Sequence, residues 1–253
     1  MAFFSAFAYK SSKSTEIGLL LGLTYYTGEL NQNGHFRPGF MHPAFGGMLR
    51  RNFNQRWAFR LMGIYGKVSG SDAVAGASVF EQNRNLSFFS TISELSGQIE
   101  FNFFPFSAAD VESYYATPFV FWGAGIFHFS PKSNKEGNKV DLRAQQYEDK
   151  TYLKINASMP FGLGFRFRAG QRFFASLEWG MRKTFTDYID DVSTVYAQNG
   201  IQRGDSQSKD WFAFAGASIS VRIGRKYNSC DFDQGSGKHR RKKIFDLSDS
   251  FAR

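Results

Sequence analysis

The chain lacks a long apolar run, and this excludes one way of crossing a membrane. No segment of its 253 residues approaches the roughly 20 consecutive apolar residues that a spanning helix needs. Mean hydropathy is also low, at -0.35. A low average does not by itself exclude a membrane, because strands with one apolar and one polar face escape such averages.

Cysteine is almost absent as well. The single cysteine, Cys230, follows the last stretch with a strand pattern, so the chain cannot form an internal disulfide. An odd cysteine in an exported protein indicates either a bond to another chain or a free thiol. The sequence leaves both interpretations open.

What the chain has in abundance is alternation of apolar and polar residues. Between Ser87 and Phe103, for example, Leu95 and Ile99 share one parity, while Glu94 and Glu100 share the other. A period of two predicts a strand with two unlike faces. We predict eight strands of about 9–11 residues, near the following ranges: Glu16–Tyr26, His42–Arg51, Trp57–Tyr65, Ser87–Phe103, Pro118–Phe129, Leu153–Phe167, Phe173–Phe185 and Trp211–Ile223. Odd-numbered residues form the apolar face, except that the second and fifth ranges are ambiguous in face.

The connections between these ranges alternate between long and shorter. Long polar connections run near Gly28–Phe40, Ser69–Asn85, Ser130–Thr151 and Asp187–Lys209, whereas Asn52–Arg56 and Ala169–Arg172 are short and Pro105–Thr117 is intermediate. This asymmetry is typical of an up-and-down antiparallel transmembrane β-barrel, with long extracellular loops and short periplasmic turns. We therefore predict an all-β barrel of about eight strands over residues 16–225, located in the cell outer membrane. An even number of strands places both termini in the periplasm.

The two ends of the chain fall outside this pattern. Residues 1–15 contain Ala6-Phe7-Ala8, which has the form of a signal-peptidase site without a basic region before it; a retained exposed segment is the alternative. Residues 226–253 form a basic tail that we predict to bind a partner in the periplasm, through Cys230, Lys238, Arg240, Arg241, Lys242, Lys243 and Phe245. A solvated arm is the alternative. Nucleic acid is excluded as a partner because the periplasm supplies none.

Charged residues on the polar faces are expected to fill the barrel. A lumen of about eight strands is just wide enough for side chains, and buried charges persist only when they are paired. We predict an interior ion-pair network, which disfavours an open porin, made of Glu16, Arg60, Glu94, Glu100, Arg166, Glu178, Arg182 and Arg222.

One catalytic alternative involves His128 and Ser130. These residues form an H-x-S pair at the end of the fifth predicted strand, and such a pair with a nearby carboxylate resembles the site of lipid A deacylases, which are outer-membrane esterase barrels. Residues two apart share a strand face, and a serine nucleophile needs a base within hydrogen-bond reach. The alternative interpretation is an interfacial histidine followed by the serine that begins a loop.

Several stretches resemble the PorG-type outer-membrane barrels of the type IX secretion system of Bacteroidota. They are Asn52–Trp57, Tyr65–Val68, Glu94–Leu95, Glu100–Pro105 and Glu178–Ser193, of which the run Asp187-Tyr188-Ile189-Asp190-Asp191-Val192-Ser193 is the most specific. The resemblance covers approximately Glu16 to Gly224. It implies a non-enzymatic barrel that anchors a periplasmic ring, built from the PorK lipoprotein and PorN, to the outer membrane. It implies no cofactor, no metal and no catalytic residue.

Overall fold

The structure is a computed structural model that describes residues 13–28, 38–71, 87–107, 114–135, 138–141, 153–170, 172–186, 189 and 210–223. Its elements are β1 (Ser14–Thr27), η2 (Pro38–Phe40), β2 (His42–Asn52), β3 (Trp57–Ser71), β4 (Ser87–Asn102), β5 (Ala116–Lys135), β6 (Asn138–Asp141), β7 (Ile155–Arg168), β8 (Phe173–Thr184) and β9 (Trp211–Ile223). Within these residues, no helix is long and apolar enough to span a bilayer.

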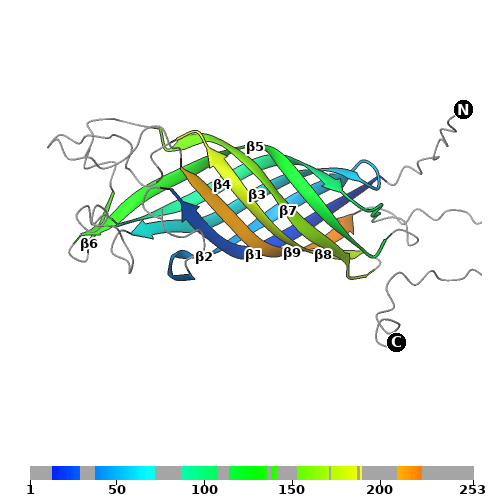
Figure 1. Cartoon of the computed structure of the whole chain (residues 1–253). Coiled ribbons are helices and arrows are strands. Elements are labelled where there is room, and N and C mark those ends of the chain that lie inside the picture. The colour runs from blue at the N-terminus through cyan, green and yellow to red at the C-terminus, as the bar shows by residue number, and fades with distance from the viewer. Residues whose placement is uncertain are drawn as a thin grey trace, which may run out of the picture.

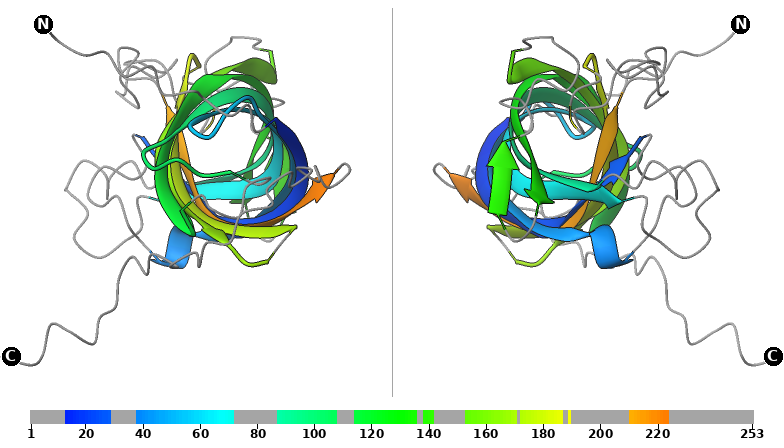
Figure 2. Two further views of the ribbon diagram at one scale, coloured as in Figure 1. Left: turned by 90° about the vertical axis from the view of Figure 1, so that its right-hand side faces the viewer. Right: turned by 90° about the vertical axis from the view of Figure 1, so that its left-hand side faces the viewer.

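The strands close into a barrel, seen from the side in Figure 1 and along its axis in Figure 2. Neighbours pair antiparallel in the order β4-β3-β2-β1-β9-β8-β7-β5, and the pairing of β4 with β5 completes the ring of eight strands. The short strand β6 pairs with the end of β5, outside this ring. The predicted all-β, up-and-down antiparallel barrel is therefore confirmed.

Most strands of the ring are longer than the predicted 9–11 residues. The shortest strand of the ring, β2, has 11 residues and the longest, β5, has 20. On β3, pairing with β4 continues from Lys67 to Ser71, beyond the last apolar position of the predicted range. The predicted range on β3 was too short because alternation marks only the part of a strand with an apolar face, whereas backbone pairing continues past it.

Side chains of even number point into the lumen on every strand of the ring except β5. On β5, Phe121 is 2% exposed whereas Trp122 is 45% exposed, so the odd-numbered residues face inward. The parity of the other strands therefore does not extend to β5. Because aromatic residues occupy both faces of β5, the sequence does not indicate which face points into the lumen. The ambiguous range at β2 follows the common rule, with Met48 and Arg50 inside and Phe45 outside.

The connections at the two ends of the barrel differ in length. Residues 53–56 and 169–172 connect strands at one end, which we call the short-turn end; residues 28–41, 72–86 and 185–210 connect strands at the opposite, long-loop end. Strand β1 begins and β9 ends at the short-turn end, where Thr15 pairs with Ile223. The alternation predicted from the sequence is present. Which end faces the periplasm remains a prediction.

The outer surface of the barrel is apolar while much of its interior is polar. Leu19 and Leu21 on β1 are 72% and 70% exposed, and large apolar residues are exposed on every strand of the ring. A water-soluble barrel would have the reverse distribution. Lipid on the outside satisfies the apolar side chains, and the closed ring leaves no unpaired strand edge, so this is a membrane-spanning barrel.

Candidate functional site

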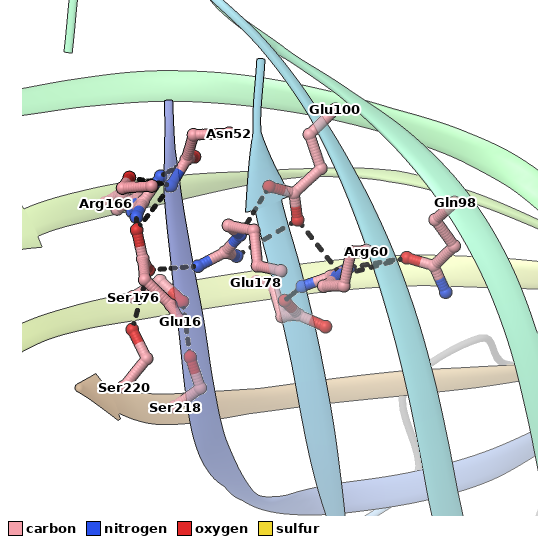
Figure 3. A network of polar contacts seen from close by, with 12 residues as sticks. Glu16, Asn52, Arg60, Gln98, Glu100, Arg166, Ser176, Glu178, Ser218 and Ser220 are labelled. Carbon is pink, nitrogen blue, oxygen red and sulfur yellow. Dashed lines mark hydrogen bonds and ion pairs between the residues drawn. The ribbon is translucent and has the colours of Figure 1, made fainter. Parts of the chain in front are cut away.

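Glu16 lies inside the lumen and accepts hydrogen bonds from three strands, β2, β7 and β9 (Figure 3). Arg166 on β7 donates to both of its carboxylate oxygens, and Arg50 on β2 lies 3.4 Å from Oε2. Asn52 Nδ2 donates to Oε1 at 2.7 Å, and Ser220 Oγ on β9 donates to Oε2 at 3.0 Å. Glu16 thus joins the strands on both sides of β1 to β7 across the lumen.

A chain of ion pairs continues from Glu16 toward β4 and β8. Arg50 donates to both oxygens of Glu100, at 2.7 and 3.0 Å, and Glu100 also lies 3.0 Å from Arg60 Nε. Arg60 then reaches Glu178 at 2.5 Å and donates to Gln98 Oε1 at 2.6 Å. These side chains are at most 5% exposed. We call the set from Glu16 to Glu178 the lumen network.

A second, looser pair lies apart from the lumen network. Arg182 Nε is 3.4 Å from Glu94 Oε2, and Arg182 also donates to the carbonyl of Gly180 at 2.7 Å. Neither carboxylate oxygen of Glu94 accepts a hydrogen bond from the described residues. The Glu94–Arg182 pair is therefore held by charge attraction more than by hydrogen bonding.

Seven of the predicted lumen residues are buried and ion-paired: Glu16, Arg60, Glu94, Glu100, Arg166, Glu178 and Arg182. Arg222 is half-buried near the end of β9, opposite Glu16 of β1 in the register. The sequence analysis missed Arg50 and Asn52, because the face of β2 was left open. Their even numbers could have placed both residues inside the lumen, since they alternate with the apolar Leu49 and Phe53.

Apolar side chains close the lumen at the long-loop end, which the sequence analysis did not predict. The cluster consists of Tyr26, Val68, Phe88, Ile92, Phe127, Phe129, Ile189 and Phe212. Tyr26 Oη donates to Asp210 Oδ1 at 2.5 Å, and Asp210 Oδ2 accepts from the backbone N–H of Ile189 at 2.9 Å. This carboxylate therefore holds a residue of the β8–β9 connection inside the mouth of the barrel.

The short-turn end is closed by the β4–β5 connection. Phe106 is 2% exposed and packs against Phe174, and the guanidinium of Arg166 lies 4.6 Å from the Phe106 ring centroid. Backbone hydrogen bonds fix this segment: Phe106 donates to Gln55, and Asn102 donates to Arg56 in the β2–β3 turn. We call this closed, cross-linked surface the floor. The segments at this end of the barrel expose Phe53, Phe104, Tyr114 and Tyr115.

We expect the barrel not to conduct ions, because side chains fill it at both ends and at its centre. The purified full chain, reconstituted in a planar bilayer, should give no steady single-channel current, whereas a porin reconstituted in parallel should. Insertion must be verified independently by protease protection of the reconstituted protein. Stable, reproducible channels would show that the lumen opens, and would contradict the plug.

The H-x-S pair lies on the outer face of β5. His128 is exposed and Ser130 is half-buried, and no hydrogen bond joins their side chains in the part of the chain that the structure describes. All acidic side chains that the structure describes are buried, namely Glu16, Glu94, Glu100, Glu178 and Asp210. None of these five carboxylates reaches the outer surface, so none of them completes a triad with His128 and Ser130.

The predicted partner-binding residues of the tail lie outside the described residues. They are Cys230, Lys238, Arg240, Arg241, Lys242, Lys243 and Phe245. The same holds for residues 1–12 of the predicted N-terminal segment and for most of the run from Asp187 to Ser193.

An apolar exterior around a filled, ion-paired lumen defines the class of small outer-membrane β-barrels. The chain belongs to the family described as a domain of unknown function (DUF6089), whose model matches residues 1–232. No curated protein matches it in sequence.

Solved structures of outer-membrane proteins resemble the chain in fold, among them the following three. Ail of Yersinia pestis, bound to the heparin analogue sucrose octasulfate, has 12% identity and a TM-score of 0.43, covering 84% of this chain and 99% of its own. Neisserial surface protein A has 7% identity and a TM-score of 0.43, covering 83% and 97%. OprG of Pseudomonas aeruginosa has 10% identity and a TM-score of 0.41, covering 84% and 99%.

Proposed function

We propose that this chain is a non-enzymatic outer-membrane subunit of the type IX protein secretion system, which anchors the periplasmic PorK/PorN ring to the membrane. The observation that carries the proposal is the closed lumen. A barrel that is filled by the lumen network and closed at both ends has no open channel for a solute. We therefore infer that it acts as a membrane anchor for other proteins. The resemblance of its sequence to PorG-type barrels supports the particular partner.

The floor supports the second half of the proposal, that a partner docks at the short-turn end. Phe104 and Tyr115 are 46% and 68% exposed there, and the ring of Phe104 stacks on Tyr114 at 5.2 Å. Arg56 donates to the carbonyl of Phe103 at 2.6 Å, which ties the β2–β3 turn to this segment. Exposed aromatic residues on a fixed backbone are typical anchors of protein interfaces.

The proposal places the short-turn end in the periplasm. Strand β9 ends at Ile223 on that side of the barrel. A periplasmic ring could then be held by the floor, by the basic residues Lys238–Lys243, and by a disulfide through Cys230. The lumen and the outer face need no catalytic role in this scheme.

Deleting residues 235–253 is expected to weaken the association with the ring while leaving the barrel folded. The deletion removes the basic cluster and Phe245 but keeps Cys230 and every described residue. The measurement is the amount of PorK and PorN that copurifies with the barrel, and the control for folding is heat-modifiable migration on a gel.

A second variant tests the floor separately. Replacing Phe104 and Tyr115 with serine removes two exposed aromatic anchors without touching the lumen network. If the deletion has no effect and the floor variant loses the ring, the floor holds the partner and the tail does not. If both variants retain the ring fully, or the intact chain never binds it, the anchoring proposal is wrong.

A further inference from the structure

The charges of the barrel are divided between its two surfaces. The acidic side chains that the structure places, those of Glu16, Glu94, Glu100, Glu178 and Asp210, are all buried, whereas the described outer surface carries Lys13, Arg51, Lys67, Arg172 and Lys183 as exposed cations. Each buried carboxylate is therefore unable to neutralise a cation on the outside. The described exterior is complementary to anions, and the anions around a membrane protein are those of lipid headgroups.

Polar residues on the outer face are concentrated on three adjacent strands near the long-loop end. Along β5, the outward residues change from Trp122 and Ile126, which are 45% and 58% exposed, to His128 and then Ser130 and Lys132. On β4, Leu95 is followed by the outward Ser93 and Thr91, and on β3 Tyr65 is followed by Lys67. We call this set, Lys67, Thr91, Ser93, His128, Ser130 and Lys132, the headgroup face.

The strand register brings these residues into two rows. Lys67 pairs with Thr91, which pairs with Ser130, and Ser93 pairs with His128. Lys132 follows one step further along β5, where it also lies opposite Asp141 of β6 in the register. Because neighbouring strands lie about 4.8 Å apart, the face is about 10 Å wide, with lysines on its two outer strands and hydroxyl groups between them.

We propose that the headgroup face binds a phosphorylated glycolipid of the outer leaflet. Two lysines separated by hydroxyl-bearing residues match a sugar headgroup that carries phosphates at both ends. The apolar residues directly below, Leu95, Ile126 and Trp122, would contact its acyl chains. The leaflet follows from the orientation in the proposed function, since short turns in the periplasm place the long-loop end outside.

The width of the face distinguishes this ligand from a phospholipid with one phosphate. A single phosphate, even where both flexible lysine side chains reach it, leaves Thr91 and Ser130 without a partner, whereas a headgroup with two phosphates can place one at each lysine and its sugar over the hydroxyl groups, across two strand spacings of about 4.8 Å each. On the neighbouring strand β7, Ile155 pairs with His128 and is 59% exposed, and Leu153, just before β7, is 80% exposed. The polar surface is therefore bounded on that side, as a binding face for one headgroup requires.

The test measures binding of lipid A with two phosphates to the purified full chain in detergent, by native mass spectrometry. Dephosphorylated lipid A and phosphatidylglycerol serve as comparison lipids. Lys67→Gln is expected to lower the affinity for diphosphorylated lipid A about fivefold, which is about 1 kcal/mol at 1.4 kcal/mol per factor of ten. The matched control is Lys183→Gln, which removes an exposed lysine of β8, outside the face, and should leave the affinity unchanged.

The proposal holds if the intact chain prefers diphosphorylated lipid A over both comparison lipids and Lys67→Gln alone removes that preference. It is wrong if the two lysine variants bind equally, or if phosphatidylglycerol binds as tightly as lipid A. Folding of each variant is checked by heat-modifiable migration on a gel. Because the assay contains no ring protein, its failure would leave the anchoring proposal untouched, and loss of the ring in the earlier experiment would leave this one untouched.

Discussion

Replacing Glu16 with alanine is expected to lower the free energy of unfolding by about 3–5 kcal/mol, the usual cost of removing one partner from a buried ion pair. The carboxylate is fully buried and accepts hydrogen bonds from Arg166, Asn52 and Ser220. Without it, the guanidinium of Arg166 has no carboxylate within ion-pair distance among the described residues, and Arg50 keeps only Glu100. Urea unfolding in detergent, followed by loss of heat-modifiable migration, measures the effect.

Glu94 provides the matched control for this prediction. It is a buried glutamate on a neighbouring level of the lumen, but its one ion pair is at 3.4 Å and it accepts no hydrogen bond from the described residues. Glu94→Ala should therefore cost less than half as much as Glu16→Ala. Equal losses for the two variants, or a loss below about 1 kcal/mol for Glu16→Ala, would show that the hydrogen bonds of the lumen network do not stabilise the barrel as argued.

A double variant separates stability from specificity. Apolar residues of similar size often replace a buried ion pair without loss of stability. Replacing Glu16 and Arg166 together with methionine should therefore recover most of the stability lost in Glu16→Ala. If the double variant is stable but migrates as several species, the lumen network serves to fix the pairing register of β1, β2 and β7 rather than to add free energy.

The fold was predictable from the sequence because its signal is local. Alternation along each strand and the lengths of the connections need no knowledge of distant contacts, and both are present in the structure. The same parity rule placed Glu16, Glu100 and Arg166 inside the barrel. The inward face could not be predicted for two strands. On β5, both faces carry similar side chains, and on β2 the face was left open, so Arg50 was missed.

The two closures of the lumen could not be predicted, because they depend on contacts between distant segments. Phe106 lies in a connection with no periodic pattern, and it enters the barrel because backbone bonds tie it to the β2–β3 turn. Tyr26 and Asp210 are 184 residues apart and meet only when β9 pairs with β1. Parity predicts which way a strand residue points, but it gives no information about residues of the connections.

Replacing Phe121 with alanine is the other substitution expected to have a large effect, about 3–5 kcal/mol, as for other buried phenylalanines. The ring extends along the lumen wall from β5 and lies over Gly162 of the neighbouring strand β7 and Gly180 of β8, which pair with each other. The guanidinium of Arg60 lies 4.9 Å from its centroid. Alanine would leave a cavity between the lumen network and the β7–β8 wall, and urea unfolding in detergent again measures the loss.

The close contact between Phe121 and Gly180 allows a second test of this packing. A Cβ at position 180 would lie 2.6 Å from Cζ of Phe121, so Gly180→Ala should cost about 1–3 kcal/mol in the intact chain. In the Phe121→Ala background the ring is gone, and the same substitution should cost clearly less, because contacting residues are not additive. Gly63→Ala is the control, since its nearest neighbour would be 3.9 Å away. Additive losses at positions 121 and 180 would show that the ring does not pack on this glycine.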